Sequence, residues 1–246
     1  IKCPDLEPSG WSFEFDNQLY PDIDDIPIVV MVLNIARMGD AEEEEQRKQA
    51  VSRAVKWIIG MQSSNGGWAA FDKDNDSQVI SKLPFSDFGE LVDPPSVDVT
   101  AHVLEMFGRI GWEENQSQIQ QAIDYVRNRQ EFDGSWFGRW GVNYIYGTAA
   151  VLPGLKSVGF DMNRPEIIDA TNWLIEHQNT DGGWGETCAS YYDPSLKGIG
   201  ASTASQTSWA IIALLAAGLQ REDSVRKGLS YLVSTQKIDG TWNEPE

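Results

Sequence analysis

Cysteine and positive charge are both scarce in this sequence. Only two cysteines, Cys3 and Cys188, occur among 246 residues, which excludes a disulfide-rich scaffold or a cysteine-based metal knuckle and favours a reducing, intracellular setting. Lys and Arg together number 19 against 37 for Asp and Glu, a net charge of −18. Because a nucleic-acid backbone is bound by clustered cations, this balance argues against a nucleic-acid partner.

Long apolar runs and leader segments are missing too. The longest apolar stretches, residues 26–36 and 209–219, are too short to cross a bilayer. The chain opens on Ile1, without an initiator Met and without the features of a signal peptide. We therefore expect a soluble chain with no transmembrane helix, and one that forms part of a longer protein.

Several catalytic signatures are absent as well. There is no Gly-rich phosphate loop, no Gly-x-Ser-x-Gly elbow and no cysteine accompanied by the partners of a nucleophile. The two histidines, His102 and His177, form no metal triad with either cysteine. Phosphoryl transfer, nicotinamide chemistry and acyl transfer are therefore poorly supported, and we expect neither a metal nor a cofactor.

Aromatic side chains, by contrast, are abundant. The sequence holds ten Trp, nine Phe and seven Tyr, and 41% of its residues are apolar. This composition predicts a sizeable hydrophobic core and excludes a disordered or fibrous protein.

The most informative pattern is an internal repeat. Four times, a Gln is preceded five residues earlier by an aromatic residue and followed six residues later by a Trp, with an Asn-Gly or Asp-Gly step between them. The pairs are Gln62–Trp68, Gln130–Trp136, Gln178–Trp184 and Gln236–Trp242. Successive Gln residues are 68, 48 and 58 positions apart, which leaves room for two helices and their loops in each repeat.

Each copy of the repeat predicts the end of an amphipathic helix. The Gly would terminate the helix in a left-handed conformation, the Gln would satisfy free backbone groups, and the indole N–H would reach a carbonyl. Further helices are expected over residues 26–36, 99–109, 147–158 and 203–217. The alternation predicts an all-α fold, an α/α barrel whose long loops, 71–95 and 185–200, gather at one end to form a pocket; an open α-solenoid is the alternative.

Three acids, Asp22, Asp24 and Asp25, stand together before the first of these helices. If they are partly buried they cannot all ionise cheaply, so at least one should hold a proton and could serve as a general acid. The ordinary alternatives are that the acids cap the helix and that His102, alone on an apolar helix, is a core residue. Acids that create a carbocation, with aromatic faces that stabilise it, are the chemistry of a protonation-initiated terpene cyclase.

The residues as a set resemble a known family. The four Gln-to-Trp repeats resemble the QW motifs of triterpene cyclases, and residues 22–25 resemble the Asp-x-Asp-Asp motif of squalene–hopene cyclases. Residues 60–68, 98–105 and 133–144 are similar to further stretches of the same family. The resemblance implies an (α/α)6 barrel, incomplete here, with residues 1–246 as one partial catalytic domain and the family's second barrel and C-terminal end outside the chain.

The resemblance also implies roles for individual residues. Asp24 would donate a proton to the terminal alkene of squalene, flanked by Asp22 and Asp25, and His102 would hydrogen-bond Asp24. The residues implied to line the cavity are Phe13, Phe71, Phe88, Trp140 and Tyr146. Two departures stand out: Phe71 replaces an expected Tyr, and Ile26-Pro27 follows the acids where the family usually has Thr-Ala.

The expected activity is cyclisation of squalene to hopene- or hopanol-type pentacyclic triterpenes, a step of hopanoid biosynthesis, by an isomerase-type terpene cyclase that needs no cofactor. The sequence does not choose between these products, and the chain on its own is expected to be inactive. The resemblance implies monotopic attachment of the complete enzyme to the cytoplasmic face of the cell membrane and allows a homodimer. The alternatives are a cyclase of a shorter prenyl diphosphate and a non-catalytic α/α toroid that binds lipids or proteins.

Overall fold

A computed structural model describes residue 3, residues 6–77 and residues 92–244 of the chain. Over these residues the chain forms eight α-helices and two short 3₁₀ helices, with isolated β-bridges but no strand. The α-helices are α1 (Asp25–Ile35), α2 (Ala41–Met61), α3 (Val97–Arg109), α4 (Ser117–Arg127), α5 (Tyr144–Ser157), α6 (Pro165–Glu176), α7 (Ala204–Ala216) and α8 (Asp223–Thr235). The 3₁₀ helices are η3 (Cys188–Tyr191) and η4 (Pro194–Leu196).

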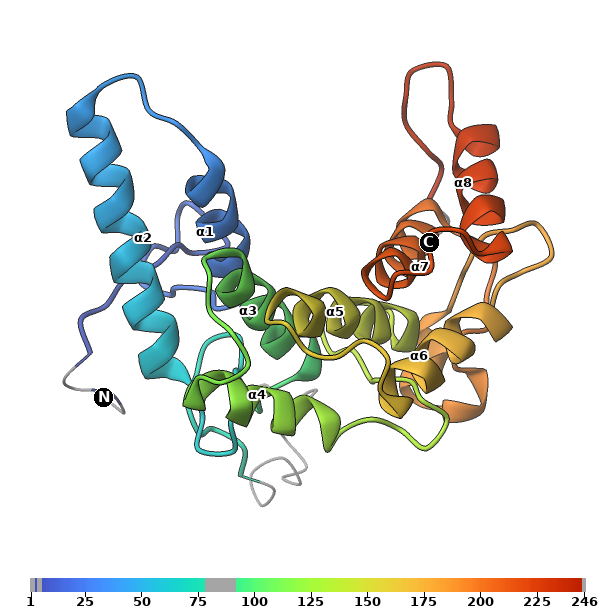
Figure 1. Cartoon of the computed structure of the whole chain (residues 1–246), viewed down its shortest axis with the longest axis horizontal. Coiled ribbons are helices and arrows are strands. Elements are labelled where there is room, and N and C mark those ends of the chain that lie inside the picture. Colours follow the sequence, from blue (N-terminus) through green and yellow to red (C-terminus); the bar gives the residue numbers. More distant parts are fainter. Residues whose placement is uncertain (1–2, 4–5, 78–91, 245–246) are drawn as a thin grey trace.

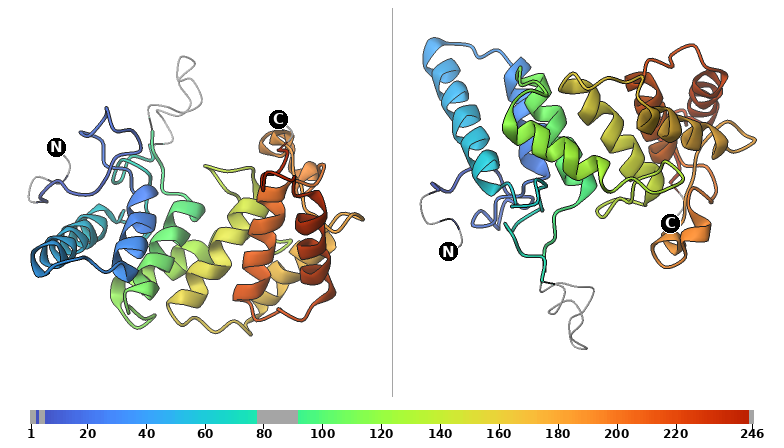
Figure 2. Two further views of the ribbon diagram at one scale, coloured as in Figure 1. Left: turned by 90° about the horizontal axis from the view of Figure 1, so that it is seen from above. Right: turned by 60° about the horizontal axis from the view of Figure 1, so that its bottom comes forward.

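The helices alternate between two rows of an open arc (Figure 1). In the inner row, α1 packs on α3, α3 on α5 and α5 on α7. In the outer row, α2 covers α1, α4 covers α3, α6 contacts both α5 and α7, and α8 covers α7. The pairs α1–α2 and α7–α8 stand at the two ends of the arc, and the turned views in Figure 2 show the same order. The predicted all-α fold with alternating inner and outer helices is confirmed as an arc of an α/α toroid.

The core runs through the middle of the arc. The first-turn and central residues of α3 and α5 are buried on almost every side, because these helices are covered by inner neighbours as well as by the outer row. Gly154 of α5 allows a close approach: a Cβ there would lie 2.5 Å from the carbonyl oxygen of Ala101 on α3. This packing holds α3, which carries His102, against α5, which carries Tyr146.

Each QW turn, the segment from the repeat Gln to the repeat Trp, joins three helices. In the second copy, the indole N–H of Trp136 donates to the carbonyl of Val126 at the end of α4 (2.9 Å). Its backbone N–H donates to the hydroxyl of Thr148 on α5 (2.9 Å). The Gln130 amide donates to the carbonyl of Glu166 in the first turn of α6 (2.7 Å). The first and third copies repeat all three contacts.

One detail of the predicted repeat is wrong. Gly66 and its three counterparts do adopt positive φ, near 90°, but they do not end the helices. Helix α2 ends at Met61, and Gly66 lies four residues beyond Gln62, inside the turn. The Gln side chain spans that turn, since its amide donates to the Gly66 carbonyl (2.9 Å). The glycine therefore shapes the link between repeats and not the helix terminus.

None of the helices in the described ranges is both long enough and apolar enough to span a membrane.

Candidate active site

The acid segment is held in place by backbone contacts on both sides. The N–H of Asp22 donates to the carbonyl of Trp11 (2.8 Å), and the N–H of Ile23 donates to the carbonyl of Ala70 (2.8 Å). Ile23 and the first-turn residue Ile26 are fully buried and fix the segment to the core. Pro27 sits in the first turn of α1, where a missing N–H breaks no helical hydrogen bond, so the departure at Ile26-Pro27 is accommodated without distortion.

Asp24 and His102 meet at the N-terminal ends of two neighbouring inner helices. Asp24 is the N-cap residue of α1, and its Oδ1 lies 2.7 Å from Nδ1 of His102 on α3. The Asp24 side chain is 27% exposed and that of His102 is 21% exposed. The structure thus brings together Asp24 and His102, which the family resemblance implies to be the acid and its hydrogen-bond partner.

Burial and mutual charge shift the titration of this cluster. Burial raises the pKa of Asp22 to about 6, and the charges of Asp25 and Asp24 add to the rise while hydrogen bonds from their backbone N–H groups oppose it. The pKa of Asp25 is raised as well, by burial and by the charge of Asp24. Asp22 is 7% exposed, and its Oδ1 accepts the backbone N–H of Asp24 (2.7 Å). The cluster therefore contains a carboxyl that retains its proton at mildly acidic pH.

His102 responds to opposing influences. Burial acts to lower the pKa of His102, but the hydrogen bond and charge of Asp24, together with the charges of Asp98 and Glu105, outweigh it, so the pKa is raised. A protonated His102 donates its Nδ1 hydrogen to Asp24 and places a positive charge beside that carboxylate.

Asp98 links His102 to the aromatic residue Trp140. It lies one turn before His102 on α3 and is fully buried. Its Oδ2 accepts the backbone N–H groups of Arg139 (2.9 Å) and Trp140 (2.8 Å). The loop that carries Trp140 is therefore attached directly to the helix that carries His102.

Three of the predicted lining residues belong to two groups of aromatic rings. The Tyr146 ring lies edge-on to His102 at 6.2 Å between centroids and edge-on to Trp209 of α7 at 4.9 Å. Phe71 and Trp140 form a second edge-on pair at 6.2 Å. Trp140 is 49% exposed and Phe71 is also exposed, so the described residues leave part of both rings uncovered. The face of an exposed aromatic ring can stabilise a carbocation.

The remaining predicted lining residues are not enclosed with this group. Phe13 lies in the N-terminal segment and is 75% exposed, so the described residues leave most of it uncovered. Phe88 lies outside the described residues. Within the described ranges no set of three or more His, Cys, Asp or Glu side chains is arranged to hold a metal ion.

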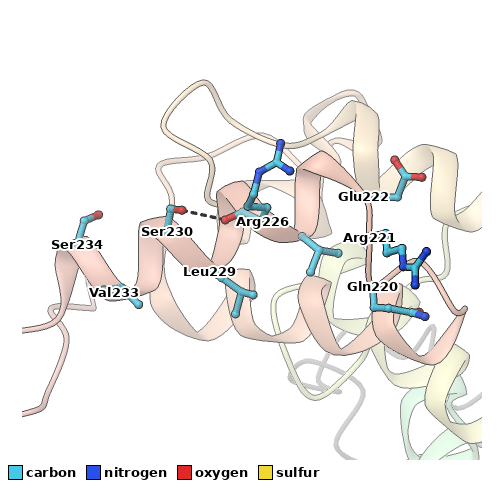
Figure 3. A pocket seen from close by; sticks show the side chains of 9 residues that line it. Gln220, Arg221, Glu222, Arg226, Leu229, Ser230, Val233 and Ser234 are labelled. Atoms are coloured by element: carbon cyan, nitrogen blue, oxygen red, sulfur yellow. Dashed lines mark hydrogen bonds between the residues drawn. The ribbon is translucent and has the colours of Figure 1, made fainter.

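The pockets of the described chain differ in how near they lie to the acid segment. One of about 420 Å³ is lined by Tyr20 and Pro21, which directly precede Asp22, and by Phe71. A pocket of about 730 Å³ runs along α8 and the turn before it, lined by Leu229 and Val233 among others (Figure 3). Helix α8 stands at the opposite end of the arc from α1 (Figure 1). This pocket is therefore separate from the acid site.

Asp98 and Trp209 were not predicted as site residues, although the sequence contains a pattern that points to them. Thr100, Thr148 and Thr207 are the inner-helix residues that bind the backbone of the preceding QW Trp. Two residues before these threonines stand Asp98, Tyr146 and Ser205, and two residues after them stand His102, Ala150 and Trp209. Aligning the inner helices on these threonines would have placed Asp98 with Tyr146 and Trp209 with His102.

Comparisons with known proteins converge on one family. A model of the squalene-hopene cyclase C-terminal domain matches residues 1–246. The squalene–hopene cyclase of Alicyclobacillus acidocaldarius is 58% identical over 245 residues, which cover 100% of this chain and 38% of that protein. The squalene-hopene cyclase of Schizosaccharomyces japonicus is 49% identical over 244 residues, with coverages of 99% and 36%. The chain thus spans less than two-fifths of the length of these relatives.

Solved structures give the same fold at lower identity. The type II terpene cyclase MstE from Scytonema superposes with a TM-score of 0.66 over 98% of this chain and 63% of that chain, at 18% identity. At this identity the likeness concerns the fold alone.

Proposed function

Because the chain belongs to the squalene–hopene cyclase family, and matches its C-terminal domain, we propose that it provides the acid that starts the cyclisation of squalene to hopene-type triterpenes. The observation that carries this proposal is the 2.7 Å contact between Asp24 and His102 inside a cluster of three carboxyls. The match over residues 1–246 supports treating the chain as one catalytic domain.

Asp24 starts the reaction by giving up the proton on its carboxyl group. The π electrons of the terminal alkene form the new C–H bond, Asp24 is left as a carboxylate, and the positive charge falls on the tertiary carbon. His102 occupies Oδ1 of Asp24 and, when protonated, stabilises the carboxylate that remains. Oδ2 is the oxygen left to carry the donated proton.

Ring closure follows without further acid. Each new carbocation accepts the π electrons of the next double bond of the chain, which forms a C–C bond and moves the charge onward. Phe71, Trp140 and Tyr146 present faces that stabilise such charges and cannot accept a proton. Loss of a proton from the final cation gives an alkene of the hopene type, and capture of water gives an alcohol of the hopanol type.

The test uses the chain in two contexts: alone, and in place of the matching 245 residues of the Alicyclobacillus acidocaldarius cyclase. Each is incubated with squalene and, separately, with geranylgeranyl diphosphate, and the extracts are analysed by gas chromatography with mass spectrometry. We expect pentacyclic products from squalene in the chimera. Products from the diphosphate alone would favour the shorter-substrate cyclase, and no product from a folded chimera would favour a non-catalytic toroid.

We also propose that the protein contacts a membrane from one side, at the cytoplasmic face. Squalene is a hydrocarbon that resides in bilayers, and the N-terminal segment exposes Phe13, Phe15 and Leu19. Co-sedimentation with phospholipid vesicles tests this proposal, and binding should weaken when Phe15 and Leu19 are replaced by Ser. Sedimentation velocity on the same samples tests the homodimer that the family resemblance allows.

A further inference from the structure

The loop that carries Trp140 has no regular secondary structure. Residues 137–143, here called the Trp140 loop, connect the second QW turn to α5. Asp98 holds the loop from the side of α3 through the N–H groups of Arg139 and Trp140. The carbonyl groups of the loop and its junction with α5 need other partners, and they find them in a distant segment.

That segment follows the third QW turn and comprises residues 186–191. The hydroxyl of Tyr191 lies 2.7 Å from the carbonyl oxygen of Gly141 and 3.3 Å from that of Arg139, so its hydrogen is shared between them. The Tyr191 ring packs edge-on against Phe137 at 5.6 Å. Burial raises the pKa of Tyr191 to about 12, so the hydroxyl keeps its hydrogen and remains a donor at neutral pH.

The other end of the segment holds the junction with α5. Glu186 is only 6% exposed, and its Oε2 accepts the backbone N–H groups of Asn143 (3.3 Å) and Ile145 (2.9 Å), the N-cap and second residues of α5. A carboxylate at this position also faces the positive end of the helix dipole. Gln206 of α7 completes the contact, since its amide donates to the carbonyl of Val142 (3.1 Å).

We propose that residues 186–191 position Trp140 for the reaction, with Tyr191 and Glu186 as positioning residues that act through the backbone of the Trp140 loop. The Trp140 loop is held by Asp98 on one side and by Tyr191 and Glu186 on the other. The contacts on both sides therefore set the position of the Trp140 ring. This inference rests on the proposed function for its catalytic consequence. Loss of the contacts made by Tyr191 and Glu186 should leave the contact between Asp24 and His102 intact and allow Trp140 to move.

Loss of this positioning should affect the distribution of products more than the rate at which squalene is consumed. In the chimera described above, Tyr191→Phe should change squalene consumption less than about 3-fold. The share of incompletely cyclised products should rise at least ~3-fold, because a cation–π contact biases the pathway more than it starts it. The matched control is Tyr192→Phe, since Tyr192 is the exposed neighbour in the chain and its loss should leave the product pattern unchanged.

A second readout does not depend on catalysis. Limited digestion of the chain with trypsin, followed by mass spectrometry, reports the rate of cleavage after Arg139 relative to cleavage after the exposed Lys237. Tyr191→Phe should raise this ratio roughly 3- to 10-fold, the factor that loss of one hydrogen bond gives. Glu186→Ala should act in the same direction, and Glu186→Gln, which keeps an acceptor oxygen, should restore most of the protection.

The two readouts separate the two proposals. Unchanged cleavage after Arg139 in Tyr191→Phe and Glu186→Ala would overturn the positioning role. An unchanged product pattern from an active Tyr191→Phe chimera would also overturn it. Faster cleavage in these variants, combined with a wild-type chimera that does not convert squalene, would uphold the contact and reject the proposed function.

Discussion

Asp24 and His102 share one hydrogen bond, and the proposed function makes Asp24 the group that loses the proton that starts the reaction. Asp24→Asn keeps the size of the side chain and removes that proton, so we expect squalene conversion by the chimera to fall at least ~10²-fold. Gas chromatography of timed extracts measures the rate, and circular dichroism checks the fold. Asp16→Asn, at an exposed position in the N-terminal segment, is the control. Near wild-type conversion by folded Asp24→Asn would show that another group donates the proton.

The raised pKa of Asp22 makes the stability of the folded chain depend on pH. Its pKa is raised from 3.8 to about 6 in the folded chain, so between about pH 4 and pH 6 the folded state binds more protons than the unfolded state. Stability therefore falls as pH rises through this window. Asp22→Asn removes this charge, and its amide oxygen can still accept the Asp24 N–H.

We expect Asp22→Asn to increase the free energy of unfolding at pH 7 by at most roughly 3 kcal/mol and to leave it nearly unchanged at pH 3.5. Urea denaturation of the variant and of the unaltered chain at both pH values measures the difference. A variant that is destabilised at pH 7 would mean that the Asp22 carboxylate is stabilised in the fold and not penalised by burial.

The site residues differ in how far the sequence could reveal them. Asp24 and His102 were predicted from their resemblance to family motifs, and the structure brings them into contact. Tyr191 and Glu186 gave no such signal, because they act on backbone groups about 40 to 50 residues away in the chain. Because almost every residue type offers the same backbone carbonyl and N–H groups, such a contact does not restrict which residue is contacted and cannot be recognised in the sequence.

At the scale of helices, the QW turns should differ in how much they stabilise the fold. Gln130 bridges the Gly134 carbonyl and the carbonyl of Glu166 in α6. In the described part of the chain, the Gln236 amide donates only to the Gly240 carbonyl. Replacement of the bridging Gln by Ala therefore loses a link between helices that replacement of Gln236 does not lose.

We expect Gln130→Ala to lower the free energy of unfolding by roughly 1–3 kcal/mol, and Gln236→Ala to lower it by about 1 kcal/mol or less. Urea denaturation followed by circular dichroism compares the two variants under one condition. Equal losses would show that the contact with the next outer helix adds nothing to stability.

The positions of the helices could be predicted from the sequence better than their exact ends and the QW turns between them. The predicted helix over 99–109 begins two residues earlier, at Val97, and the one over 147–158 begins three residues earlier, at Tyr144. Both starts lie in segments held by tertiary contacts, such as the Glu186 carboxylate at the N-terminus of α5. The glycines of the QW turns were assigned to helix ends because Asn-Gly and Asp-Gly steps favour left-handed backbone in turns and helix caps alike.

At the scale of the whole molecule, the arc leaves apolar side chains uncovered. Val32 and Ile35 on α1 are 57% and 76% exposed, and Ile28 on the same face of the helix is also exposed. Contiguous patches of this kind promote association. We expect the chain at micromolar concentration to scatter light as species larger than a monomer and to bind a hydrophobic dye.

Replacement of Val32 and Ile35 by Lys should reduce both the scattering and the dye binding. Ile168→Lys, at an exposed position on the outer helix α6, serves as the control and should change neither. A monodisperse monomer with little dye binding would contradict the expectation for the unaltered chain.

The QW contacts also give the molecule a direction of assembly. In each of the first three copies, the Gln reaches a carbonyl that lies later in the chain, at Gln118, Glu166 or Ser224. None of these three turns is complete until the following outer helix has been synthesised, so we expect the arc to form stepwise from its N-terminal end during translation. The last contact of each helix pair therefore depends on the next pair. If synthesis stops part-way, we expect only the most recent QW turn to lack the hydrogen bond from its Gln to the following outer helix.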